Sequence, residues 1–443
     1  MLDIHWQPGY VYPPVFHPPH VPMDGFAAAV FVLVAICVAL LTLRRPAMGI
    51  AALIVLTPFS FAHYLAGTSV TLSKAALLGF VIGLIRHRPS LVVLRDRLLV
   101  RFLVAFGGVI LTMLLSAFAA GDHAVVSREV AKWVEYGVTF IAATVALAND
   151  PDDRAIWDAI GIATVLVCLQ GIAQEFIGAP AGIFIHGQPF PRIAGPLEGP
   201  NQCSAWLGIA IPVLFARVLV HRDWRLVAIL VLAAVTQALT LSRSGIVASI
   251  LACIIVLFAS RPPKAVRWRF AAGAVVLVGI LFTLGIAIGL ESRFFSLAET
   301  VQADHLGTRA ELWRAALDLW RMSPIVGVGA GNYELDLGRV GLPEVHTHAN
   351  SLYLQSLAET GVLGFVATLV LVYVSIQSFA KATSRRPLII GAFGASVAFA
   401  VHQIFDYLVF FPKIGLLWWL ILAVGAVEVI QSRRDALPAE VAA

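Results

Sequence analysis

Residues 26–43 read FAAAVFVLVAICVALLTL, an apolar run without a single charged residue. The hydrocarbon core of a bilayer is about 30 Å thick and needs a helix of about 20 apolar residues to cross it, so this run predicts a membrane-spanning helix. The run ends at Arg44-Arg45-Pro46, and a second apolar run follows at once. Apolar runs and short basic connections alternate in this way along the chain, which predicts an all-α, polytopic transmembrane helix bundle.

The composition indicates the same class. Hydrophobic residues make up 59% of the 443 residues and charged residues only 13%, about half the charge of a soluble domain. Single-pass, secreted and cytosolic proteins are therefore excluded. The net charge of +5 comes from basic residues in short groups between apolar runs, without a basic tail or stripe. Membrane orientation requires this pattern, so we predict a surrounding lipid bilayer and no nucleic acid partner.

The basic residues also predict how the bundle is oriented. If the N-terminus faces outward, 20 of the 31 Lys and Arg residues lie in inward-facing connections, as the positive-inside rule requires. A re-entrant early segment would instead give twelve spans and an inward N-terminus. We expect about 12–13 spans, at residues 26–43, 47–66, 70–85, 102–119, 131–148, 155–178, 202–220, 224–241, 244–260, 271–290, 350–379, 388–405 and 413–431.

This pattern divides the chain into five parts. An extended outer segment (1–25) precedes about ten spans (26–290), and an extracytoplasmic loop domain (291–349) separates these from the last three spans (350–431). A short cytoplasmic tail follows (432–443). The loop domain has an ordinary soluble composition and is the one large outward-facing segment with a helix of its own.

That helix is predicted from about residue 308 to Met322, where Pro324 stops it and a glycine-rich turn follows. It is amphipathic, so it should lie on the outer membrane surface or cap the bundle. Its expected apolar face consists of Leu312, Trp313, Ala316, Leu317 and Trp320, and the turn contains Gly327, Gly329 and Gly331.

Two arginines on the outward side are candidates for binding an anion. Arg243 lies in a Leu-Ser-Arg-Ser-Gly turn between two spans, where a guanidinium needs an anionic partner or must extend to the interface. Arg309 opens the loop helix, and its fork suits bidentate phosphate binding. By spacing alone Arg309 resembles Arg314 and Arg321, which we interpret as surface charges beside Asp318.

The segment His346-Thr347-His348-Ala349-Asn350 directly precedes a span. A histidine here could take a proton from a hydroxyl near neutral pH, or be an ordinary interfacial residue. Because no Cys or carboxylate cluster lies nearby in the sequence, we predict no metal site. Asn350, Gln355 and Glu359 continue along one helical face, which should face a cavity or a partner helix.

Three further positions, one asparagine and two glycines, lie at or within predicted spans, and each has a structural interpretation. Asn201 follows Glu198 at the start of the seventh span, where it either caps the helix or binds a ligand. Gly361 and Gly364 predict close helix packing.

Several segments, in the right order, resemble blocks of the bacterial O-antigen ligase and polymerase superfamily. They cover roughly residues 190–365, whereas the first half of the chain is similar only as generic membrane helices. The segments are RIAGPLEGPNQCSAWLGIAIP (192–212), TLSRSGIVA (240–248), TRAELWRAAL (308–317), SPIVGVGAGNY (323–333) and HTHANSLYLQSLAETGVLG (346–364).

The resemblance implies a GT-C-like glycosyltransferase that works without a metal ion or other cofactor. It would move a glycan, with inversion, from a polyprenyl diphosphate lipid to an acceptor hydroxyl on the outer face of the bacterial cytoplasmic membrane. Arg243 and Arg309 match the arginines that engage the diphosphate, and His348 matches the base. Asn350 stands where many members have a second histidine, which leaves the contribution of His346 open. The expected substrate-binding residues are Arg243, Arg309, Arg192, Asn201, His346, Asn350, Gln355 and Glu359.

The resemblance leaves the acceptor open. A lipid A core would make the protein a ligase, and the next lipid-linked repeat would make it a polymerase; other polysaccharide assembly proteins are candidate partners. A transporter or flippase is the contrasting hypothesis, but the sequence has no internal repeat and only Lys74 and Glu135 as candidate intramembrane charges. A non-enzymatic assembly protein would tolerate replacement of Arg243 and Arg309.

Overall fold

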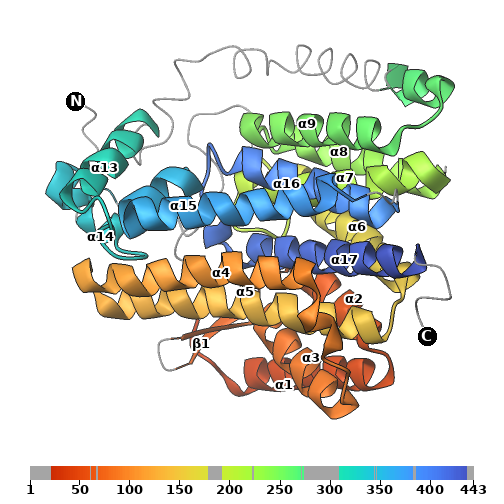
Figure 1. The fold of residues 1–443 in the computed structure, drawn as a ribbon, viewed down its shortest axis with the longest axis horizontal. Coiled ribbons are helices and arrows are strands. Elements are labelled where there is room, and N and C mark those ends of the chain that lie inside the picture. The colour runs from red at the N-terminus through yellow and green to blue at the C-terminus, as the bar shows by residue number, and fades with distance from the viewer. Residues whose placement is uncertain are drawn as a thin grey trace.

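The computed structural model is a bundle of helices packed side by side (Figure 1). Within the residues it describes, eight helices are long and apolar enough to cross a membrane, which confirms the predicted all-α polytopic bundle. Helices lie at all the predicted spans in these ranges, whereas the predicted span 271–290 lies almost entirely outside them. The described residues are 21–59, 61–65, 68–177, 192–221, 224–270, 272–273, 309–343, 345, 347–382 and 386–436.

The bundle contains helices of two lengths. The longer ones are α1 (Gly25–Arg44), α4 (Arg97–Ser116), α5 (His123–Asn149), α6 (Asp153–Ile177), α7 (Pro200–His221), α9 (Arg243–Ser260), α15 (Leu352–Ala380) and α17 (Pro412–Asp435). The shorter ones are α2 (Pro46–Leu56), α3 (Leu72–His87), α8 (Trp224–Leu239) and α16 (Pro387–His402). Single 3-10 turns lie at η1 (Val92–Arg95), η2 (Ala117–Ala119) and η4 (Leu408–Phe410).

The predicted span at residues 47–66 is wrong beyond Leu56. The helix at this place, α2, has 11 residues and is about 16 Å long, roughly half the thickness of the hydrocarbon core. Pro58 has no N–H to donate within a helix, and the helix ends just before it.

A β-hairpin follows α2 in place of the second half of that span. Its strands are β1 (Ala62–Leu65) and β2 (Thr68–Thr71), which pair antiparallel. Tyr64 in β1 donates its N–H to the carbonyl of Val21 at 2.8 Å and accepts from the N–H of Met23 at 2.9 Å. The hairpin therefore returns the chain to the end of the bundle at which α1 begins, so α3 starts there as the span alternation predicts.

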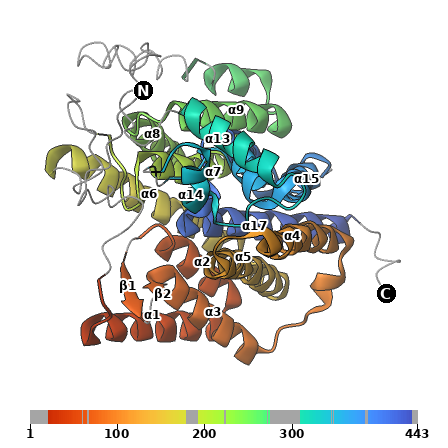
Figure 2. The ribbon, with the colours of Figure 1, turned by 90° about the vertical axis from the view of Figure 1, so that its left-hand side faces the viewer.

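α17 lies in the middle of the bundle and is buried along almost its whole length (Figure 2). Trp418 stacks on Phe399 of α16 with ring centroids 4.0 Å apart, and Trp419 packs edge-on against Phe106 of α4 at 5.2 Å. Aromatic packing thus fixes α17 against its neighbours. Because residues 403–411 connect α16 directly to α17, this packing also holds that connection in place.

Ion pairs join the connections at one end of the bundle, where α17 finishes (right in Figure 1). Arg45 lies 3.2 Å from Asp150 and 2.9 Å from Asp152, and Arg386 lies 3.2 Å from Glu428. The basic connections that the orientation argument assigns to the inward side therefore gather at a common end.

The opposite end is capped by α13 (Arg309–Met322), α14 (Tyr333–Asp336) and η3 (Leu337–Val340) (Figure 1). α13 packs on the first half of α15. The hydroxyl of Tyr333 donates to the carbonyl of Leu312 at 2.7 Å and ties α14 to α13. The predicted helix end at Met322 and the predicted turn are thus both observed, the three glycines of that turn having positive φ.

The predicted apolar face of α13 is partly wrong. Its fully buried residues are Leu312, Ala315, Ala316 and Leu319, whereas both tryptophans are only half-buried at the edge of this face. The reason is that α13 lies against α15 and α14, so small and aliphatic residues fill the contact and the large rings lie around it.

Candidate active site

The structure brings the main predicted site residues to the end of the bundle that α13 caps. Arg309 is the first residue of α13, Arg243 is the first residue of α9, and His348 precedes α15. His346 lies outside the described residues. Arg192 is described, and it is the first described residue after a gap that ends at residue 191.

The connection between α16 and α17, residues 403–411, lies between the elements that carry these side chains. The carbonyl of Gln403 accepts a hydrogen bond at 3.0 Å from the N–H of Leu352, the first residue of α15. On the other side, the ring of Trp313 in α13 lies 6.4 Å from that of Phe405. One short segment therefore positions the start of α15 relative to α13.

His348 lies in a pocket of aromatic rings and is only 6% exposed. Its imidazole stacks on Phe410, with centroids 5.0 Å apart, and meets the edges of Tyr407 and Phe411 at 5.7 and 5.8 Å. Burial, followed by the positive charge of Lys132, lowers the pKa of His348 to about 3. The imidazole is therefore neutral near pH 7 and can accept a proton without first losing one.

A buried ion pair on α5 forms part of the same pocket. Lys132 Nζ lies 2.7 Å from a carboxylate oxygen of Glu129 and 4.7 Å above the ring of Phe410. The two charged side chains are only 14% and 11% exposed. Sequence analysis missed this pair, although opposite charges three residues apart on a helix are a recognisable signal.

Gln355 and Glu359 face the interior of the bundle, as their spacing predicts. Gln355 donates from Nε2 to Glu359 Oε1 at 2.6 Å and accepts at Oε1 from the N–H of Ala349 at 2.7 Å. Asn350 takes a left-handed conformation with φ of 49°, which asparagine tolerates better than most residues. These contacts fix the backbone on both sides of the turn that follows His348.

α15 is broken at Gly361, where φ is 65° and ψ is −166°, a conformation nearly restricted to glycine. The turn from the outer loop enters this break: Val328 and Gly329 donate to the carbonyls of Ala358 and Glu359, both at 2.9 Å. A glycine was predicted here for close helix packing, but its role is to let the chain leave the helix so that the loop can bind its carbonyls.

A second group of polar atoms gathers around the start of α9. A Cβ atom added to Gly245 would lie 2.8 Å from His402 Cε1, so the last residue of α16 packs against the first turn of α9. The positive charge of Arg309 acts on the same histidine. Sequence reasoning did not find His402, because it lies far along the chain from both arginines and within an apolar run.

Arg192 and Asn201 are brought together, and they support the turn before α9. Arg192 donates from Nη2 to Asn201 Oδ1 at 2.7 Å and from Nε to the carbonyl of Thr240 at 2.9 Å. They therefore hold the residues that lead to Arg243.

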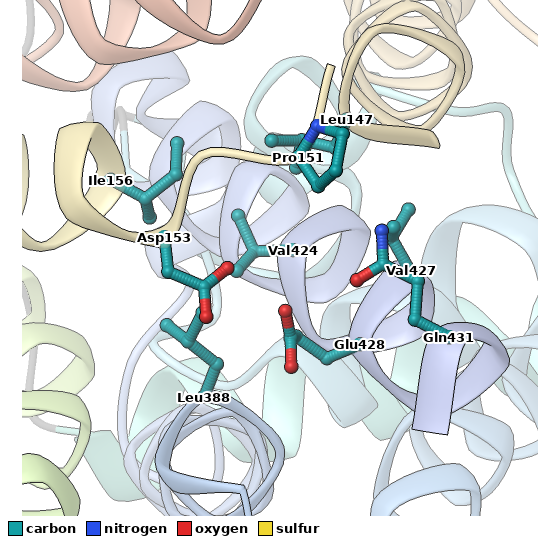
Figure 3. Close-up of a pocket in the computed structure, with 9 residues that line it drawn as sticks. All are labelled: Leu147, Pro151, Asp153, Ile156, Leu388, Val424, Val427, Glu428 and Gln431. Atoms are coloured by element: carbon teal, nitrogen blue, oxygen red, sulfur yellow. The ribbon is translucent and has the colours of Figure 1, made fainter. Parts of the chain in front are cut away.

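No three side chains of His, Cys, Asp or Glu in the described part of the chain group as metal ligands. A small pocket lies at the other end of the bundle, between the start of α6, the start of α16 and the last turns of α17 (Figure 3). Asp153, Leu388 and Glu428 line it. It is therefore remote from His348 and Arg309.

The architecture defines a polytopic membrane protein, and its capped end carries the candidate site. Residues 228–369 match the family model described as O-antigen ligase, which confirms the resemblance to the O-antigen ligase and polymerase superfamily. The match supports a membrane glycosyltransferase of O-antigen ligase type in general and includes Arg243, Arg309 and His348. No curated protein matches the chain significantly.

Proposed function

We propose that this protein transfers a glycan from a polyprenyl diphosphate lipid to an acceptor hydroxyl, with inversion and without a metal ion. The site would face the periplasm from the bacterial inner membrane. The observation that carries the proposal is that residues 403–411 contact both the pocket of a neutral, buried His348 and the helix that begins with Arg309.

In this reaction His348 takes the proton of the acceptor hydroxyl. The hydroxyl oxygen forms a bond to the anomeric carbon while the bond from that carbon to the diphosphate oxygen breaks, so the electron pair leaves with the diphosphate. With a pKa of about 3, His348 is a weak base in this structure. A bound anion nearby raises the pKa of a histidine, so its basicity would increase once the donor is present.

Arg243 and Arg309 engage the diphosphate as it departs. Guanidinium groups form strong, charge-assisted hydrogen bonds to phosphate, and in a partly dehydrated site they can supply the neutralisation that a metal ion gives elsewhere. Removing one such donor typically costs about 3 kcal/mol, or two orders of magnitude in rate. Arg192 and Asn201 would contribute by holding the turn before Arg243.

Gln355, Glu359 and Asn350 would act on the reaction through the position of His348. Gln355 hydrogen-bonds to Glu359 and to the N–H of Ala349 next to the histidine, and Asn350 holds the left-handed turn that follows it. The candidate catalytic residues Arg243, Arg309 and His348 lie at one end of the bundle, which favours transfer at a membrane face over transport through the midplane.

The length profile of the surface glycan in a deletion strain tests the proposal and identifies the acceptor. Full-length lipid-linked chains that never reach lipid A mean that the protein is a ligase. Single lipid-linked repeats mean that it is a polymerase for O-antigen or exopolysaccharide. An unchanged glycan profile would contradict both.

A further inference from the structure

Three buried polar atoms near the start of α9 have no hydrogen-bond partner within the described part of the chain. They are His402 Nε2, Arg309 Nε and Ser242 Oγ. They come from α16, α13 and the residue that precedes α9. Buried polar atoms are nearly always paired, so these three are available to bind a ligand.

The chemistry of these atoms defines that ligand. Arg309 Nε is a donor only, and Ser242 Oγ and His402 Nε2 can both donate. The N-terminus of α9, an 18-residue helix, adds backbone N–H groups without intrahelical partners and the positive end of its dipole. An anion can accept from all of them and is favoured by the arginine and the helix dipole, and phosphate oxygens are suited to this arrangement.

His402 is the member of this group that lies outside the matched segment 228–369. It is 2% exposed, and its ring packs against the first turn of α9 beside Gly245. A buried imidazole nitrogen without a hydrogen-bond partner costs free energy. An anion that accepts a hydrogen bond from Nε2 would remove this cost.

We infer that His402 is a further diphosphate-binding residue, which donates from Nε2 to a phosphate oxygen of the polyprenyl diphosphate at the N-terminus of α9. This inference rests on the proposed function, since that supplies the donor lipid. It means that the last residue of α16 contacts the diphosphate directly. It requires no proton transfer at His402.

Binding of polyprenyl diphosphate without glycan to the full-length protein in lipid nanodiscs tests the inference. A hydrogen bond to a charged group is lost in His402→Leu, so its dissociation constant should rise about ten-fold or more. His402→Gln keeps a donor and should bind within a few-fold of the wild type. His221→Leu, at an exposed histidine that ends α7, is the matched control and should bind like the wild type.

Polyprenyl monophosphate, inorganic pyrophosphate and phosphatidylglycerol nanodiscs distinguish the sources of phosphate. An effect of His402→Leu that is largest for the polyprenyl diphosphate supports the inference. Unchanged binding by His402→Leu, equal losses in the Leu and Gln variants, or an effect confined to phosphatidylglycerol would overturn it. If binding depends on His402 but the wild type transfers no glycan, the proposed function fails and the binding site stands.

Discussion

The imidazole of His348 and the ring of Phe410 stack with centroids 5.0 Å apart and planes inclined by 24°. The same ring also contacts Lys132, whose Nζ lies 4.7 Å from the centre of the Phe410 ring. A single side chain therefore contacts both the proposed base and a cation.

Replacing Phe410 by leucine should lower the rate of glycan transfer by about 10- to 100-fold, because a displacement of the base by about 1 Å has effects of this size. The change should appear mainly in kcat. Phe258→Leu is the control, since Phe258 is 65% exposed and lies in the last turn of α9, at the end of that helix away from the site. A Phe410→Leu protein with the kcat of the wild type would show that the stacking is irrelevant to transfer.

The Glu129–Lys132 pair should be important for stability because it is buried. Lys132→Met leaves Glu129 unpaired and should cost about 3–5 kcal/mol of unfolding free energy, while Glu129→Gln combined with Lys132→Met should recover most of it. Thermal unfolding of the purified variants measures this. The matched control is Arg321→Met, which removes an exposed ion pair with Asp318 and should cost less than about 1 kcal/mol. If the double variant instead loses the sum of the unfolding free energies that the two single replacements cost, the account is contradicted.

Gly361→Ala should destabilise the protein and reduce transfer. Its Cβ would lie 2.2 Å from the carbonyl oxygen of Ile325, at a φ of 65° that only glycine adopts readily. Gly107→Ala in α4 is the control, because nothing lies within 4 Å of the added Cβ and alanine is the better helix former. Melting temperatures should fall for the first variant and stay level or rise for the second. The reverse order would disprove the role of the break in α15.

Acid should destabilise the wild type partly through His348. The pKa of this histidine is about 3 in the folded protein and about 6.5 when unfolded, so the unfolded state binds the extra proton between these values. Its stabilising contribution is therefore complete above pH 6.5 and is lost as the pH falls towards 3. His348→Gln lacks this contribution, so its melting temperature should fall less between about pH 7 and pH 4.5. If the melting temperatures of both proteins fall equally over this range, His348 takes up its proton in the folded protein as readily as in the unfolded one.

Much of the fold follows from local sequence, because an apolar run long enough to cross a bilayer forms a helix almost wherever it occurs. The exceptions have tertiary causes. Pro58 shortens α2, and the hairpin that follows is held by the segment before α1. Gly361 is visible in the sequence, but a glycine within an apolar run indicates helix packing as readily as a break, and only the fold shows that the outer loop occupies one here.

The candidate site was predictable only in part. Arg243, Arg309 and His348 stand in recognisable motifs, and the structure brings them to one end of the bundle. Lys132 and His402 stand in apolar helices far along the chain from those motifs, so only the packing of α5 and α16 shows that they line the site.

The central claim is that His348 is the base for glycan transfer from a lipid diphosphate. The most direct measurement is the transfer rate of purified protein in liposomes that contain a polyprenyl diphosphate-linked glycan and an acceptor. His348→Ala should reduce this rate by about 100-fold or more while donor binding and the melting profile show an intact fold. Transfer by His348→Ala at nearly the wild-type rate would contradict the account.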